Sequence, residues 1–93
     1  MIENFLQHFL DSLNIFGLTY LVENKFDESY KIFEDILEQD SKNIKAINSL
    51  GRLYHEKRIS LKAEEFYLKA LNIKSDSYEI LNNIAGFYRE EGE

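Results

Sequence analysis

Similar residues recur at one fixed interval along this chain, and this periodicity limits what it can fold into more than any other feature of the sequence. The interval is the separation of Gly17 and Gly51, and we call it the repeat period. It also relates Tyr20 with Tyr54 and Tyr88, Phe33 with Tyr67, Leu37 with Leu71, and Ser41 with Ser75. Such a set of residues in phase is typical of repeat proteins, in which each unit buries an apolar face against its neighbours. The chain is therefore expected to fold as a stack of similar units within a single domain, residues 1–93.

Each unit divides into two helical halves. In the second unit, apolar residues recur at spacings of three and four on both sides of a break at residues 57–60: Ile44, Ile47, Leu50 and Tyr54, then Ala63, Phe66, Tyr67, Ala70, Leu71 and Ile73. Such spacing places side chains on one face of a helix. The chain has no proline and only four glycines, so little interrupts long helices. An all-α fold of antiparallel helix pairs follows, with short connections between the helices.

The repeat period also sets the expected boundaries of the units. Residues 10–43 form the first repeat, residues 44–77 the second, and residues 78–93 a half-repeat or capping helix, while residues 1–9 extend the first helix. Helix-capping side chains are expected just before the second and third units, at Ser41 and Ser75 or at competing positions nearby. The competitors are Asp40, Asn43, Asp76 and Ser77.

The repeated positions resemble the signature of the tetratricopeptide repeat (TPR) family: a large apolar residue, Leu-Gly, Tyr, then a small residue and an aromatic one. The second unit has Ile47, Leu50-Gly51, Tyr54, Ala63, Tyr67 and Ala70; the first has Leu13, Phe16-Gly17, Tyr20, Ser29, Phe33 and Ile36; the third has Leu81, Ile84-Ala85 and Tyr88. The resemblance implies a short right-handed α-solenoid of two full repeats plus one terminal helix. It also implies a concave groove, lined by the first helix of each pair, that holds a peptide.

The chain departs from the family pattern at its turns. Ser41 and Ser75 stand where the family has a closing proline, and Asn24 and Arg58 stand where it has a glycine between paired helices. Asparagine tolerates the left-handed conformation of such a turn better than arginine does. Within the second pair, Gly51 and Ala63 are expected where the helices approach closely, so a larger side chain at either position should overpack the core.

Composition and charge disfavour several classes of function. The formal net charge of −6 opposes nucleic-acid binding, and the absence of cysteine excludes disulfides and thiolate chemistry. No stretch is long and apolar enough to span a membrane, so no membrane partner is expected and the cytoplasm is the default location. His8 and His55 are isolated from other ligand or catalytic side chains. We therefore expect neither an enzyme nor a metal site nor a cofactor.

Three asparagines in register mark the expected peptide-binding face. Asn14, Asn48 and Asn82 follow one another at the repeat period, off the apolar stripe of their helices. An asparagine amide both donates and accepts hydrogen bonds, as a peptide group does, so a row of them could hold an extended backbone. The other residues expected on this concave face are Leu18, Leu21, Lys45, Arg52, His55 and Arg89.

Apolar residues at the two ends of the array are expected to be uncovered. Phe5 and Phe9 lie in the extension of the first helix, and Tyr78 and Phe87 lie in the lone last helix. Exposed apolar patches commonly mark partner surfaces, so these four residues are candidates for self-association.

The sequence thus predicts a non-catalytic adaptor or chaperone-like module that binds another protein or a peptide, with three alternatives open. The chain could be a structural unit that dimerises through its apolar ends. It could be part of a larger TPR protein, or the regulatory appendage of an enzyme encoded beyond it. The fold alone does not choose among these roles.

Overall fold

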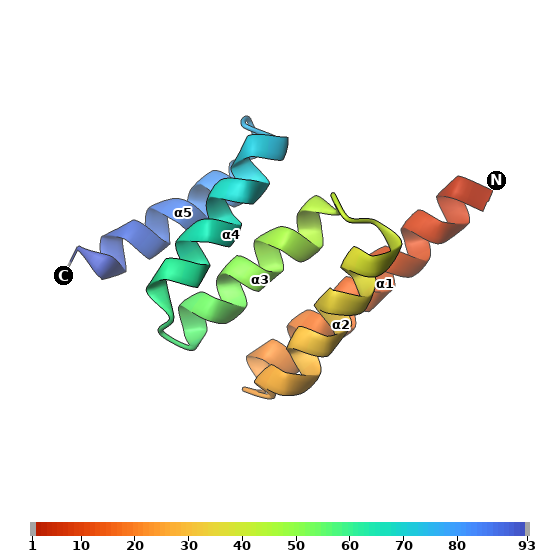
Figure 1. Cartoon of the computed structure of the whole chain (residues 1–93), viewed down its shortest axis with the longest axis horizontal. Coiled ribbons are helices and arrows are strands. Elements are labelled where there is room, and N and C mark those ends of the chain that lie inside the picture. Colours follow the sequence, from red (N-terminus) through yellow and green to blue (C-terminus); the bar gives the residue numbers. More distant parts are fainter. Residues whose placement is uncertain (1, 93) are drawn as a thin grey trace.

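The computed structural model describes residues 2–92, with side-chain environments from Asn4 onward. That part of the chain contains no strand and five helices: α1 (Ile2–Val22), α2 (Phe26–Gln39), α3 (Ile44–Glu56), α4 (Ser60–Ile73) and α5 (Tyr78–Glu91). The predicted all-α class is confirmed. Each helix packs against the next in the sequence, and α1 and α5 lie at opposite ends of an elongated molecule of 47 × 30 × 17 Å (Figure 1). This packing is compatible with a helical repeat.

The two turns that lack glycine adopt the same left-handed geometry. Asn24 and Arg58 have φ angles of 63° and 64°. The next residue in each turn bonds back to the helix, Lys25 N to the Tyr20 carbonyl at 2.8 Å and Ile59 N to the Tyr54 carbonyl at 2.9 Å. This is the bond by which a left-handed residue closes a helix C-terminus. The departure at Arg58 therefore leaves the turn intact, at the cost of a backbone conformation that L-residues disfavour.

Asparagine and serine cap the first helix of the second and third units. The Asn43 Oδ1 accepts from Ala46 N at 3.0 Å, and the Ser77 Oγ accepts from Ile80 N at 3.4 Å. Of the competing cap positions, the structure thus uses Asn43 and Ser77, which are again one repeat period apart. Ser41 and Ser75 lie exposed in the preceding loops.

Glycine against an aromatic ring sets the close approach within both helix pairs. A Cβ placed on Gly17 would lie 2.5 Å from Phe33 Cε1, and one on Gly51 would lie 2.6 Å from Tyr67 Cδ1. Ala63 is fully buried in the same core cluster as Tyr67. The tight packing predicted at Gly51 is therefore confirmed, and Ala63 is buried as expected.

The core divides into two clusters that share α3. One cluster fills the space among α1, α2 and α3, and the other fills the space among α3, α4 and α5. The buried members of the first are Leu10, Leu21, Phe33, Ile36, Ala46, Leu50 and Leu53. The buried members of the second are Ile47, Ala63, Tyr67, Ala70, Ile80, Ile84 and Phe87. One side of α3 contributes to the first cluster and another side to the second. α3 is therefore packed on both sides, whereas α1 and α5 each have one side that stays exposed.

Two predicted surface residues belong to this core. Leu21 was expected to line the groove, but it is buried in the first cluster. Phe87 was expected at an uncovered end, but it is buried against the rings of Tyr67 and His55. Both errors have one cause: each side chain points at a neighbouring helix, and the repeat period alone does not distinguish that side of a helix from the side that faces solvent.

None of the helices in the described part of the chain combines the length and the apolarity required to cross a bilayer.

Candidate protein-binding face

The first helices of the three units, α1, α3 and α5, lie side by side: α1 contacts α3, and α3 contacts α5. Polar side chains join them at repeating positions. The Ser49 Oγ donates to Asn14 Oδ1 at 3.1 Å, which links α3 to α1. The Asn83 Nδ2 donates to Asn48 Oδ1 at 3.3 Å, which links α5 to α3. We call these four residues the polar ladder.

The polar ladder changes the interpretation of the asparagine register. Asn14 is only 8% exposed and Asn48 only 5%. The carbonyl oxygen of Asn14 accepts a hydrogen bond from α3, and that of Asn48 accepts one from α5. Asn82, the third in register, is exposed. The expectation of an open row of amides is therefore wrong for Asn14 and Asn48, because a buried amide must first be satisfied within the protein.

The donor residues of the polar ladder were expected to face the groove, and their role in joining helices was not predicted from the sequence. Ser49 and Asn83 directly follow Asn48 and Asn82, and they are also one repeat period apart. A second polar position in register, one residue after the first, is the signal that could have revealed this role. In a stack of repeats it indicates bonding between equivalent helices.

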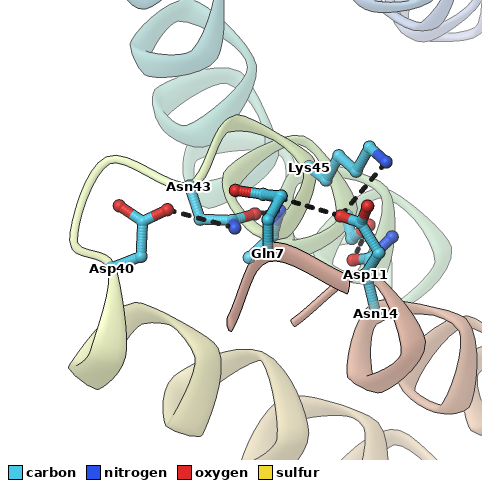
Figure 2. Close-up of polar contacts among 8 residues, drawn as sticks. Gln7, Asp11, Asn14, Asp40, Asn43 and Lys45 are labelled. Carbon is cyan, nitrogen blue, oxygen red and sulfur yellow. Dashed lines mark hydrogen bonds and ion pairs between the residues drawn. The ribbon is translucent and has the colours of Figure 1, made fainter. Parts of the chain in front are cut away.

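An ion pair ties the N-terminal half of α1 to the start of α3. The Lys45 Nζ lies 3.2 Å from Asp11 Oδ1, and the Gln7 Nε2 donates to the same oxygen at 3.0 Å (Figure 2). Partial burial opposes ionisation of Asp11, but the hydrogen bond from Gln7 and the charge of Lys45 outweigh it, so its pKa is lowered. Lys45 was expected to be available to a ligand; it is exposed but already paired.

Figure 2 also shows how this corner is built. Gln7 and Asp11 of α1 turn toward the end of α3 that Asn43 caps, and the Asn43 Nδ2 donates to Asp40 Oδ2 at 3.3 Å. A shallow pocket of about 230 Å³ opens here, lined by Gln7, Asp40, Lys42, Asn43, Ile44 and Lys45. The contacts drawn in this corner serve helix–helix packing or capping.

His55 links α3 to α5 at the other end of the face. Its Nε2 lies 2.8 Å from Glu90 Oε1, and its ring is edge-on to Phe87 with ring centroids 5.2 Å apart. The side chain is 19% exposed. His55 was predicted to line the groove, but most of its side chain is in contact with α5 instead. Within residues 4–92 no three His, Cys, Asp or Glu side chains gather into a possible metal site.

The face that remains open is apolar on α1 and charged on α3. In the repeat register, Leu18 and Val22 of α1 correspond to Arg52 and Glu56 of α3. Leu18 is half-buried, while Val22, Arg52 and Glu56 are exposed, as is Arg89 of α5. Some of the predicted groove residues take no part in the polar ladder and remain accessible to a ligand. Arg52, Asn82 and Arg89 are exposed, and Leu18 is half-buried.

The candidates for self-association fall into two groups. Phe5, Phe9 and Tyr78 are exposed, as expected, whereas Phe87 is buried. The exposed apolar surface of α1 also includes side chains not singled out as candidates for this role, namely Leu6, Ile15, Phe16 and Val22.

Comparison of the sequence with known protein families and with characterised proteins finds no match. The resemblance to TPR proteins thus rests on the residue pattern and its spacing.

Proposed function

We propose that this chain is a TPR-type right-handed α-solenoid, of two helix pairs and a terminal helix, that acts as a non-catalytic adaptor. It binds an extended segment of another protein across α1, α3 and α5. The observation that supports this role is the side-by-side arrangement of these helices, fixed by the polar ladder. Such an arrangement offers one continuous surface, because neighbouring packed helices lie only about 8–10 Å apart.

The chemistry of the open face indicates the class of ligand. Leu18 and Val22 on α1 favour an apolar side chain of the ligand, and Arg52 on α3 favours an acidic one. Lys45 contributes less, because Asp11 neutralises it at 3.2 Å. We infer a peptide whose apolar residue lies over α1 and whose carboxylate lies over α3.

Peptide selection would test this role. Wild-type protein should select from a random displayed library a set of peptides enriched in an apolar residue a few positions from Asp or Glu. Arg52→Glu should weaken the selected peptides at least tenfold, because it replaces attraction by repulsion at the carboxylate. Lys31→Glu makes the same charge change on the exposed surface of α2 and should leave affinity unchanged. Equal affinity of the Arg52→Glu protein would rule out this face.

A second candidate function, self-assembly, is favoured by the apolar outer side of α1. Ile15 and Phe16 are large, exposed and adjacent on that helix. Monomeric proteins rarely leave such a patch uncovered without a partner surface being involved.

A further inference from the structure

One side of α5 carries residues that correspond to those on one side of α3. That side is covered by another helix in α3 but is exposed in α5. Tyr78, Leu81 and Ala85 follow Ile44, Ile47 and Gly51 by one repeat period. On α3 the equivalent side packs against α4, with Gly51 against the ring of Tyr67. On α5, Ala85 is exposed and Tyr78 is 81% exposed. Among residues 2–92, α5 contacts α3 and α4, and the α5 residues buried there are Ile80, Ile84 and Phe87, which lie on another side of the helix.

The helices that cover the equivalent sides of α1 and α3 share a pattern. Each presents a small residue, a large apolar residue three positions later, and an aromatic residue one position after that. In α2 these are Ser29, Ile32 and Phe33, and in α4 they are Ala63, Phe66 and Tyr67. The aromatic ring lies against the glycine of the partner helix, and in the first pair the Ser29 Oγ donates to the Gly17 carbonyl at 2.7 Å.

The outer side of α1 carries the same pattern. Ser12, Ile15 and Phe16 repeat the spacing of Ser29, Ile32 and Phe33. None of them contributes to either core cluster: Ser12 is exposed, Ile15 is 65% exposed and Phe16 is 61% exposed. α1 therefore has two faces, an inner one that packs on α2 and α3, and an outer one with the sequence of a covering helix.

From this match we propose that α1 of a second copy of the chain packs antiparallel on the uncovered side of α5, with Phe16 of one copy against Ala85 of the other. The contact completes the third helix pair in trans. It goes beyond the adaptor role, since it uses neither Leu18 nor Arg52, and it stands or falls separately.

The dimensions of the two helices permit this contact. α1 has 21 residues and α5 has 14, so at a rise of about 1.5 Å per residue α1 is the longer helix. With Phe16 opposite Ala85, α1 covers α5 from Glu79 to its C-terminal end, and Tyr78 lies at the margin of the contact. Ala85 carries a Cβ where Gly51 has none, and a Cβ on Gly51 would lie 2.6 Å from Tyr67. The Phe16 ring must therefore lie about 1 Å farther out than Tyr67 does, at ordinary van der Waals distance.

A second copy fits this side better than a charged partner does. The side itself consists of Tyr78, Leu81 and Ala85, and the covering pattern on α1 consists of Ser12, Ile15 and Phe16, so neither contains an ionisable group at neutral pH. None of these six side chains carries a charge that must be desolvated at the centre of the contact. The charged Arg89, one turn after Ala85, lies at its edge, where it can stay solvated. Both sides exist on every copy, at opposite ends of the long axis (Figure 1). The contact is therefore head-to-tail, and it continues from copy to copy unless a ring closes.

The size of the contact predicts weak association. At 81% and 61% exposure, Tyr78 and Phe16 together expose on the order of 300 Å². Stable interfaces bury about 800 Å² on each partner, and one helix laid on another reaches only part of that. We therefore expect a Kd in the micromolar to millimolar range, visible as a mass that rises with concentration.

Complementation between two variants tests the proposal. Phe16→Asp removes the covering side of α1, and Ala85→Arg blocks the uncovered side of α5; both positions are exposed, so the fold should tolerate the changes. By light scattering, wild type should rise from the monomer mass of 11.0 kDa toward dimers and larger species. Each variant alone should stay at the monomer mass up to about 1 mM, near the weak limit of specific binding. The mass of their equimolar mixture should rise with concentration toward twice the monomer mass and should not exceed it, because only one productive contact remains.

Each other outcome overturns the proposal. A wild type that stays monomeric over the same range excludes the contact. Association of Ala85→Arg alone would show an α1–α1 interface instead, and a mixture that stays monomeric would show that the two sides do not meet. Tyr30→Asp makes the same kind of change at an exposed aromatic residue of α2; it is the matched control and should associate like wild type. Helicity by circular dichroism confirms folding, and Ile15→Asp repeats the α1 test if Phe16→Asp is unfolded.

Discussion

The Ser49 hydroxyl of α3 donates a hydrogen bond to the Asn14 amide oxygen of α1 at 3.1 Å, in a position where Asn14 is 8% exposed. Asn48 stands in the same relation to Asn83 of α5. These amides therefore hold successive units together. Their recurrence at the repeat period reflects the geometry of the stack, and it needs no ligand to explain it.

Replacing Asn14 should lower stability. Asn14→Ala leaves the buried Ser49 hydroxyl without its acceptor, so we expect the free energy of unfolding to fall by about 1–2 kcal/mol in urea titrations. Asn82→Ala is the matched control, since Asn82 occupies the same position in register but is exposed; its effect should stay within about 0.5 kcal/mol. Equal losses for the two variants would contradict a structural role for the buried bond.

The all-α class was predictable because its determinants are local. Helical spacing, the register of Gly17 and Gly51, and a left-handed turn at Asn24 follow from short sequence patterns, and the structure bears them out. Arg58 adopts the same left-handed turn, although the sequence pattern favoured it less there. The candidate site was harder to predict. Leu21 and Asn48 share a helix face with exposed residues, and only the position of the neighbouring helix decides which of them is covered.

Gly51 should not tolerate even one added methyl group. A Cβ there would lie 2.6 Å from the Tyr67 ring, so Gly51→Ala should destabilise the fold by about 1–3 kcal/mol despite the better helix propensity of alanine. Gly86→Ala provides the contrast, because the nearest atom to its Cβ would be the Arg89 side chain at 3.8 Å. That variant should gain up to about 1 kcal/mol. Thermal unfolding of the two variants measures whether each change raises or lowers stability. A loss of stability in both variants would show that steric contact is not what distinguishes the two positions.

The turn at Arg58 should be improvable. Its φ of 64° is disfavoured for a residue with a Cβ, and glycine adopts it freely. We expect Arg58→Gly to raise the free energy of unfolding by about 1 kcal/mol. Asn24→Gly, at the equivalent turn, should gain less, because asparagine already tolerates this conformation. A gain at Asn24 larger than the gain at Arg58 would show that something other than the backbone conformation limits the second turn.

Alkaline pH should destabilise the protein through Tyr67. Burial raises the pKa of its hydroxyl from an ordinary 10.0 to about 12, even though the nearby Arg52 charge lowers it. Tyr67 ionises at a lower pH in the unfolded chain than in the folded protein. Its contribution to the free energy of unfolding is therefore fully present below pH 10.0 and is lost as the pH rises toward about 12. The loss should amount to about 2–3 kcal/mol, since each pKa unit corresponds to about 1.4 kcal/mol. Urea titrations across this range should show the decline in wild type and a much flatter profile in Tyr67→Phe, which keeps the ring against Gly51 but has no proton to lose. A decline as steep in Tyr67→Phe as in wild type would assign the alkaline transition to other groups.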